Sequence, residues 1–216
     1  MPQVFSRSGT LAVKLTLIAL VLLTIAGVAV AEWTMSGPID VDSMPFQPIP
    51  FSHKHHAGDD GIDCRYCHTA VEKAAFAGMP STHLCLTCHS QLFRDAPVLA
   101  PLHESARTGT PVQWTRVYKL PGFVYFDHSV HVNHGVGCVE CHGRVDEMPI
   151  TRREAPLTMQ WCLECHRDPG PHLRARDQVF SMAETDTLRT AASPDFMRLY
   201  GIESQRRLTD CSTCHR

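Results

Sequence analysis

Ten cysteines and five of the fourteen histidines in this 216-residue chain fall into one repeated pattern. Two residues separate the cysteines of each pair, and histidine follows each second cysteine at once. The cysteines are Cys64, Cys67, Cys85, Cys88, Cys138, Cys141, Cys162, Cys165, Cys211 and Cys214. The histidines are His68, His89, His142, His166 and His215. C-x-x-C-H is the attachment signature of c-type haem, so the sequence predicts five covalently bound haem c groups.

The spacing of this pattern suits haem attachment. Two thiols add to the two vinyl groups of the porphyrin as thioethers, and two intervening residues let both sulfurs meet one porphyrin edge. The next histidine then lies beneath the ring and gives its imidazole to iron. We therefore expect the ten cysteines to hold the haems and the five histidines that follow them to be proximal iron ligands.

Disulfides, zinc ribbons and a redox dithiol are the other interpretations of paired cysteines. Exported proteins with an even number of cysteines usually form disulfides, and two C-x-x-C pairs at these separations also fit a zinc ribbon. None of these sites requires a histidine after every pair. Two four-cysteine zinc sites would also leave one pair over. No cysteine remains for a disulfide or a free-thiol role.

Four of the nine remaining histidines stand in two F-x-H-x-x-H clusters, which begin at Phe51 and Phe126. On a helix, residues i and i+3 project to the same side. One imidazole of a cluster can therefore reach the haem of its own site while the other reaches a neighbouring haem. The expected distal iron ligands are His53, His56, His128 and His131.

The distal ligand of the fifth haem stays open. It could be a methionine or one of the remaining histidines, and Met159 and Met148, which lie close to haem motifs in the sequence, are the leading candidates. Thioether ligation usually raises the potential of a haem relative to two histidines. A methionine more often fills a gap in a core. The roles of His55, His83, His134 and His172 also stay open, and His55 or His134 could exchange roles with a named ligand.

The clusters belong to a longer internal repeat. Each copy runs from F-x-H-x-x-H through a haem motif and Met-Pro to Cys-Leu-x-Cys-His. We interpret this as a duplicated two-haem module, at about 51–96 and 123–170, with a fifth haem at 211–215.

The N-terminal residues are apolar. Leu15 to Ala31 carries no charge, and the apolar region extends to Leu11 with one interruption at Lys14. A cleaved signal peptide would end as Ala29-Val30-Ala31 does, whereas a retained anchor needs about 20 apolar residues. We expect residues 1–31 to be an uncleaved transmembrane anchor.

The charges that flank the anchor predict its orientation. Arg7 and Lys14 have no acidic neighbours, which places the N-terminus in the cytoplasm and residues 32–216 outside. We expect a single-pass protein of the inner (cytoplasmic) membrane, with its haem domain on the periplasmic side.

Composition favours an irregular fold. Fifteen prolines and thirteen glycines argue against long helices or a broad sheet. We expect a mostly irregular chain with short α-helices packed around five haems, plus one N-terminal transmembrane helix. Residues 97–111 should form a surface loop, Trp114 to Phe126 a strand or hairpin, and residues 177–208 one or two helices.

The formal net charge of −2 excludes a basic nucleic-acid-binding protein. Five neighbouring haems with closed axial positions suit electron transfer, and we expect no catalytic residue in the chain. A multihaem reductase would instead need an iron with an open distal position. A haem sensor would not need five haems.

Three stretches of the chain resemble a known family. They are FSHKHHAGDDGIDCRYCHTAVE, LPGFVYFDHSVHVNHGVGCVECHG and PLTMQWCLECHRDP. They resemble the membrane-anchored pentahaem cytochrome c subunit of alternative complex III, a bacterial quinol-oxidising complex.

The resemblance implies an electron-transfer subunit of a quinol-oxidising membrane complex. Its partners would include an iron–sulfur subunit, together with a monohaem cytochrome or another soluble or membrane-bound acceptor. The alternative is a membrane-anchored multihaem quinol dehydrogenase cytochrome that feeds a periplasmic reductase.

Overall fold

The computed structural model describes residues 6–36, 41–183 and 195–215. The chain divides into two compact units, Met1–Ile39 and Asp40–Arg216. The first unit holds one long helix, and the second holds all five cysteine motifs.

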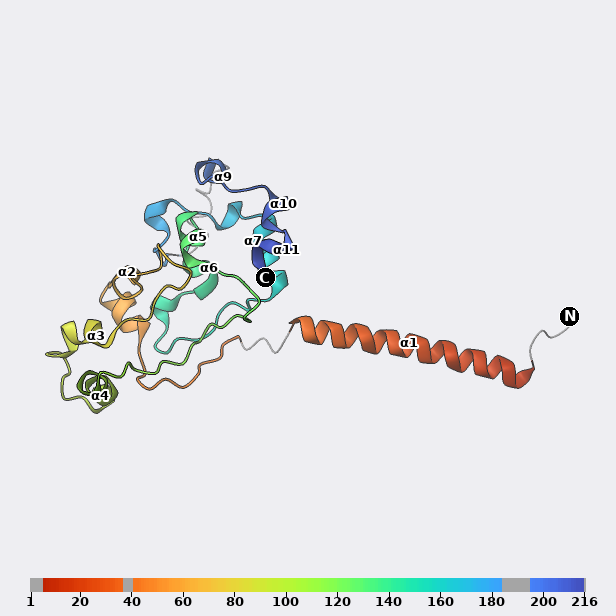
Figure 1. The fold of residues 1–216 in the computed structure, drawn as a ribbon, viewed down its shortest axis with the longest axis horizontal. Helices are drawn as coiled ribbons and strands as arrows, with labels where there is room; N and C mark the ends of the chain where they lie inside the picture. Colours follow the sequence, from red (N-terminus) through yellow and green to blue (C-terminus); the bar gives the residue numbers. More distant parts are fainter. Residues whose placement is uncertain (1–5, 37–40, 184–194, 216) are drawn as a thin grey trace. The chain divides into compact units, whose positions relative to one another are not determined.

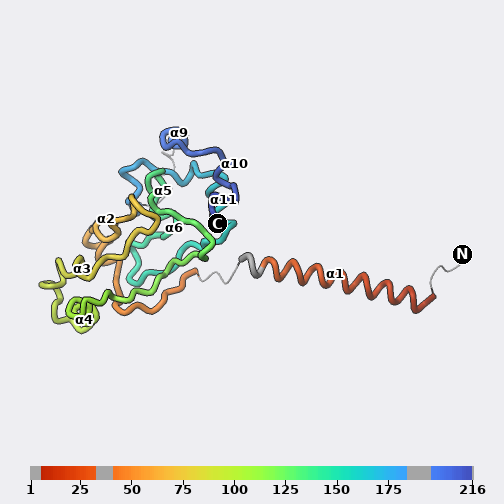
Figure 2. The backbone as a smooth tube through the Cα atoms, in the orientation of Figure 1, coloured from red at the N-terminus to blue at the C-terminus, as the bar shows by residue number. Residues whose placement is uncertain are grey.

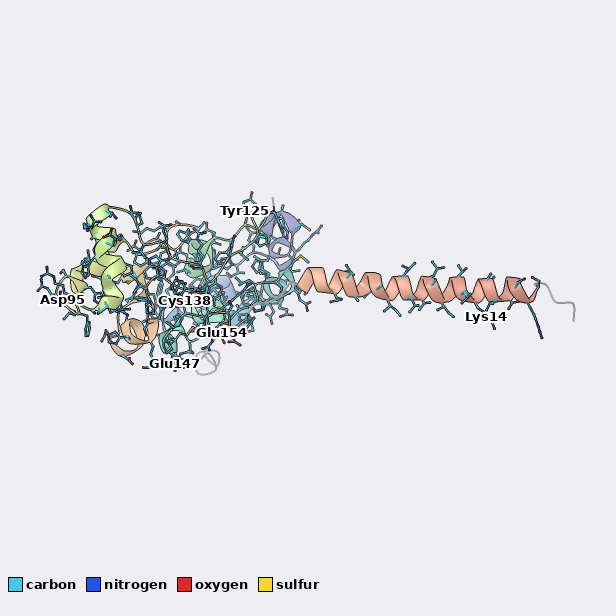
Figure 3. All side chains as sticks on the ribbon, turned by 90° about the horizontal axis from the view of Figure 1, so that it is seen from below. Lys14, Asp95, Tyr125, Cys138, Glu147 and Glu154 are labelled. Atoms are coloured by element: carbon cyan, nitrogen blue, oxygen red, sulfur yellow. The ribbon has the colours of Figure 1, made fainter. Side chains whose placement is uncertain are left out.

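The helix of the first unit is α1 (Arg7–Ser36), with 30 residues. At about 1.5 Å per residue it is long enough to cross a hydrocarbon layer of about 30 Å. Its apolar side chains are exposed on all sides, as Figure 3 shows. Within the described residues, α1 is the one helix whose length and composition suit a membrane span.

The second unit consists of short helices joined by irregular chain (Figure 1). No strand forms among the described residues, where two isolated bridges, Val124 with His215 and Val136 with Leu173, are the only β pairing. The predicted fold class, mostly irregular with short helices, is confirmed. The helices are η1 (Lys54–Asp59), α2 (Cys64–Cys67), α3 (Thr82–His89), η2 (Pro97–Leu99), α4 (Ala100–Thr108), α5 (His128–Asn133), α6 (Val139–His142), η3 (Val145–Glu147), α7 (Met159–Arg167), η4 (Gly170–His172), η5 (Arg176–Gln178), α9 (Asp195–Leu199), α10 (Gln205–Leu208) and α11 (Cys211–Cys214).

Each cysteine motif lies on a short helix, and four of these helices begin with a side-chain cap. A cap satisfies a backbone N–H of the first turn, which lets so short a helix form. A helical turn places the two cysteines, at i and i+3, on one side. The capping side chains are Asp63 for α2, Ser81 for α3, Thr158 for α7 and Asp210 for α11.

The prediction of a surface loop over residues 97–111 is wrong. η2 leads into α4, which buries Leu102 to 2% exposure. Proline is tolerated in the first turn of a helix, where its missing N–H has no intrahelical partner. Gly109, with φ of 70°, ends α4 in the left-handed conformation. The residues that suggested a loop are therefore the two ends of a helix.

The expected strand or hairpin between Trp114 and Phe126 is also absent. Val124 forms only the isolated bridge with His215. In the predicted helical region 177–208, α9 and α10 are short, and residues 184–194 lie outside the described residues.

The side-chain core of the second unit is small. Two buried clusters form, one of Ile49, Leu99 and Leu102 and the other of Val71, Val132 and Val179. Apolar side chains near the cysteine motifs remain exposed, among them Tyr66, Phe76, Phe93, Phe123 and Met159. The polypeptide alone does not cover the apolar surfaces around its motifs.

The two repeats pack reciprocally. The helical turn η1 of the first repeat lies against η3 of the second, and the N–H of Lys54 donates to the carbonyl of Met148 at 3.0 Å. In return, α5 of the second repeat lies against residues 72–75 of the first: the N–H of His128 donates to the carbonyl of Ala75 at 3.2 Å. The repeats therefore form one folded body.

Glycine at position 58 permits the contact between η1 and η3. A Cβ atom there would collide with the carbonyl oxygen of Asp146. We expect Gly58→Ala to destabilise the fold by about 1–3 kcal/mol, although alanine favours helix, because the backbone of η3 must move. Thermal unfolding of the purified protein measures the change.

The matched control for this substitution is Gly122→Ala. No heavy atom lies within 4 Å of a Cβ at that position. Its effect should stay within about 0.5 kcal/mol. Equal melting temperatures for the two variants would refute the steric argument at position 58.

Candidate haem-binding site

Four of the five expected proximal histidines each face one histidine of the F-x-H-x-x-H clusters. The ring centroids are 6.4 Å apart for His53 and His68, 6.0 Å for His56 and His89, 6.4 Å for His128 and His142, and 6.1 Å for His131 and His166. A metal about 2 Å from each imidazole nitrogen places two ring centres roughly 6 Å apart. The four pairs have the separation that two axial ligands of one iron need.

The hydrogen bonds of these imidazoles also favour a metal between the paired rings. Nδ1 of His68 donates to the carbonyl of Gly78 at 2.8 Å, and Nδ1 of His166 donates to the carbonyl of Leu208 at 2.9 Å. An imidazole whose Nδ1–H is held by a carbonyl presents the lone pair of Nε2 to a metal. The same bond holds His56, His89, His128 and His131.

The two clusters share one local geometry. Phe51 stacks on His56 with centroids 4.4 Å apart, and Phe126 stacks on His131 at 4.6 Å. In both clusters the phenylalanine therefore fixes the plane of the second imidazole. The sequence pattern contained this phenylalanine but did not reveal its role.

The two histidines of each cluster face the histidines of two different cysteine motifs. His53 faces the histidine of the motif that follows it directly, and His56, one turn later, faces that of the next motif. His128 and His131 repeat this arrangement in the second module. Four of the motifs thus form two closely spaced pairs.

The cysteines show which motifs are spatial neighbours. Burial raises the pKa of Cys67, and the thiol of Cys85 raises it further. Burial and then Cys64 raise the pKa of Cys138 to about 12. Burial and then Cys165 raise the pKa of Cys141, and burial and then Cys214 raise the pKa of Cys162. The third motif therefore lies beside the fourth, and the fourth beside the fifth.

The motifs, numbered 1 to 5 along the chain, therefore lie in the spatial order 2–1–3–4–5. The first and third are neighbours at the centre, where the two repeats meet. Helix α3, with the second motif, and α11, with the fifth, lie at opposite ends of the unit (Figure 2). The sequence did not reveal this order.

The fifth motif has a different environment. Phe123 is the aromatic ring nearest to His215 among the described residues, at 6.0 Å between centroids, and no imidazole faces it there. Met159 is 54% exposed on the first residue of α7, one turn before Cys162, which is the neighbour of Cys214. Met148 is 1% exposed and packs in the interior beside η1.

The remaining histidines have other surroundings. His55 lies 3.6 Å from a carboxylate oxygen of Asp60, and Nδ1 of His134 donates to the carbonyl of Val130. Nδ1 of His172 lies 2.8 Å from a carboxylate oxygen of Glu140. His83 lies on α3, and the Nε2 atom of His103 on α4 is buried without a hydrogen-bond partner in the described part of the chain.

The donor set fits haem c. All ten cysteines are free of disulfides, every motif pairs two thiols with an imidazole, and exposed apolar side chains lie next to the motifs. Haem supplies the apolar faces that such side chains pack against, and it takes two thioethers and axial imidazoles. The sequence did not single out Glu140, which lies inside the third motif and forms an ion pair with Arg174.

Comparisons with known proteins agree with this chemistry. The family model described as cytochrome c7 and related cytochrome c matches residues 124–216, which contain the third, fourth and fifth motifs. The chain is also 40% identical, over 175 residues, to the menaquinone reductase multiheme cytochrome c subunit of Nitratidesulfovibrio vulgaris (strain Hildenborough). That match covers 79% of this chain and 77% of the relative.

Proposed function

This chain belongs to the multihaem cytochrome c family that contains the menaquinone reductase subunit, and we propose that it carries electrons within a membrane-bound quinone oxidoreductase. The observation that carries the proposal is the set of four facing imidazole pairs in one folded body. Two strong axial ligands per iron suit electron transfer, because no position is left for a substrate.

The residues of the chain have three tasks in this proposal. The ten cysteines would tether five haem c groups, and His68, His89, His142, His166 and His215 would be the proximal ligands of the irons. Bound haem c supplies a one-electron iron couple at each motif. His53, His56, His128 and His131 would be the distal ligands, and the Nδ1 hydrogen bonds of these imidazoles would keep the rings in place.

The fifth distal ligand is assigned to Met159 in preference to Met148. Met159 stands one helical turn from Cys162, the neighbour of Cys214. Met148 is enclosed next to η1, where His53 already faces His68. A thioether at the end of the series would give the fifth site a higher potential than the imidazole pairs.

Two directions of electron flow have support. The resemblance to the pentahaem cytochrome of alternative complex III favours quinol oxidation, in which a quinol gives up two electrons and two protons and becomes a quinone. The name of the relative favours the reverse, the reduction of menaquinone. In both, the chain passes single electrons between partner subunits, and quinone chemistry takes place outside it.

The proposal also covers the location of the chain and its partner subunits. Helix α1 anchors the chain in the inner membrane, and residues 32–216 lie on the periplasmic side. An iron–sulfur subunit, together with a monohaem cytochrome or another acceptor, exchanges electrons with the end sites of the series. Membership of the relative in a reductase supports the presence of other subunits.

The proposed function is tested on the purified membrane complex that contains this chain. Menaquinol added anaerobically should reduce its haems, or the reduced haems should reduce added menaquinone. The faster of the two reactions identifies the direction of flow. A complex whose haems exchange electrons with neither compound contradicts the proposal.

Haem content is the simplest prediction. The mature chain should carry five haems, and the Cys211→Ala/Cys214→Ala variant should carry four. Pyridine haemochrome absorbance per chain and the mass of the intact chain measure the number. Free thiols at any motif of the mature chain would count against attachment there.

A further inference from the structure

A buried ion pair joins the third motif to Arg174. Glu140 stands between Cys138 and Cys141, and its side chain is 8% exposed. Arg174, 3% exposed, donates from Nη2 to the Oε1 atom of Glu140 at 3.1 Å. His172 holds the other carboxylate oxygen through Nδ1, at 2.8 Å.

The fold holds Arg174 in this place. Its N–H donates to the carbonyl of Gly135 at 2.8 Å, and its carbonyl accepts from the hydroxyl of Tyr200 at 2.6 Å. Its Nη1 donates to the carbonyl of Ser181 at 3.1 Å. A Cβ atom on Gly137 would lie 2.7 Å from Nε of Arg174, so the guanidinium lies directly against the backbone that enters the motif.

The carboxylate belongs to the third motif. Glu140 is one of the two residues between Cys138 and Cys141, and it stands two residues before His142, the expected proximal ligand of that site.

Burying such a pair does little for stability. The free-energy cost of removing two ions from water offsets most of the attraction between them. Well-packed apolar residues often give a fold the same stability. A buried charge near a haem has a larger consequence for the reduction potential of that haem, because the potential depends on the charge and the burial around the iron. The position of the pair, at the third motif, favours this second role.

We propose that Arg174 sets the reduction potential of the third haem by compensating the charge of Glu140 inside its motif. The inference rests on the proposed electron-transfer function. Reduction adds one electron to each ferric iron and gives ferrous iron. An uncompensated carboxylate opposes that added electron and lowers the potential, whereas an uncompensated guanidinium favours it and raises the potential.

The test is a redox titration of the full-length holoprotein with its haems counted. Glu140→Gln keeps the shape of the side chain and removes the charge, and it should raise the midpoint potential of one haem. Arg174→Gln should lower the potential of the same haem. Arg174→Lys keeps the positive charge and should restore most of the wild-type potentials.

Arg107→Gln is the matched control, because it breaks an exposed ion pair, Arg107 with Glu104, away from the third motif. It should shift no haem. Shifts of equal sign in Glu140→Gln and Arg174→Gln, or unchanged potentials in Glu140→Gln with all its haems bound, would overturn the inference. If Arg174→Gln fails to assemble, Glu140→Gln alone decides. A wild-type chain without haem would instead refute the proposed function.

Discussion

Removal of the first haem site should isolate the second site from the other three. In the spatial order 2–1–3–4–5, the Cys64→Ala/Cys67→Ala variant leaves a gap between the second and third sites. Electrons placed on the remaining haems by a light pulse should then equilibrate in two phases. The slower phase, by orders of magnitude, should belong to one haem of four. Time-resolved absorbance of the purified variant measures both phases.

Removal of the second site gives the opposite result. The Cys85→Ala/Cys88→Ala variant leaves sites 1, 3, 4 and 5 in contact, so we expect one fast phase. Cys211→Ala/Cys214→Ala removes the other end of the series and serves as the matched control with one fast phase. If the haems followed their order along the chain, removing the second site would isolate the first. A slow phase in that variant would therefore reject the spatial order.

The second large effect concerns the distal imidazoles. His131→Met should replace the imidazole opposite His166 by a thioether and raise the potential of one haem. Axial ligands set haem potentials over a range of about 0.8 V, so the shift should be among the largest that a single substitution in this chain can cause. A redox titration followed by absorbance resolves the shifted haem.

His134→Met is the matched control for His131→Met. Both imidazoles donate from Nδ1 to the backbone carbonyl four residues earlier, but His131 alone of the two faces the ring of His166. The potentials of His134→Met should equal those of the wild type. A shift in His134→Met with none in His131→Met would exchange the roles of the two histidines.

The repeat explains why the two modules pack as they do. The first histidine of each cluster is anchored on the other module, His53 on Thr151 and His128 on Ala75. Each module therefore orients one cluster histidine of its partner. This reciprocity joins the first and third motifs at the centre and leaves the second and fifth at the ends.

The haem motifs could be identified from the sequence because their chemistry is local. Thioether attachment needs two thiols and an imidazole within five residues, so spacing along the chain is sufficient to predict them. The F-x-H-x-x-H clusters were also recognised, since one helical turn relates their two histidines. The same local signals misled over residues 97–111, where proline and glycine mark the ends of α4 rather than a loop.

Contacts between distant residues carry the information that local patterns lack. The order 2–1–3–4–5 depends on how two repeats fold onto each other, and the glycine at position 58 matters only because Asp146 lies against it. Arg174 meets Glu140 across 34 positions of the chain. Residue types and spacing thus determined which groups can bind haem. Tertiary packing alone decided which haems become neighbours and which charges surround them, because those distances arise only when remote segments come together.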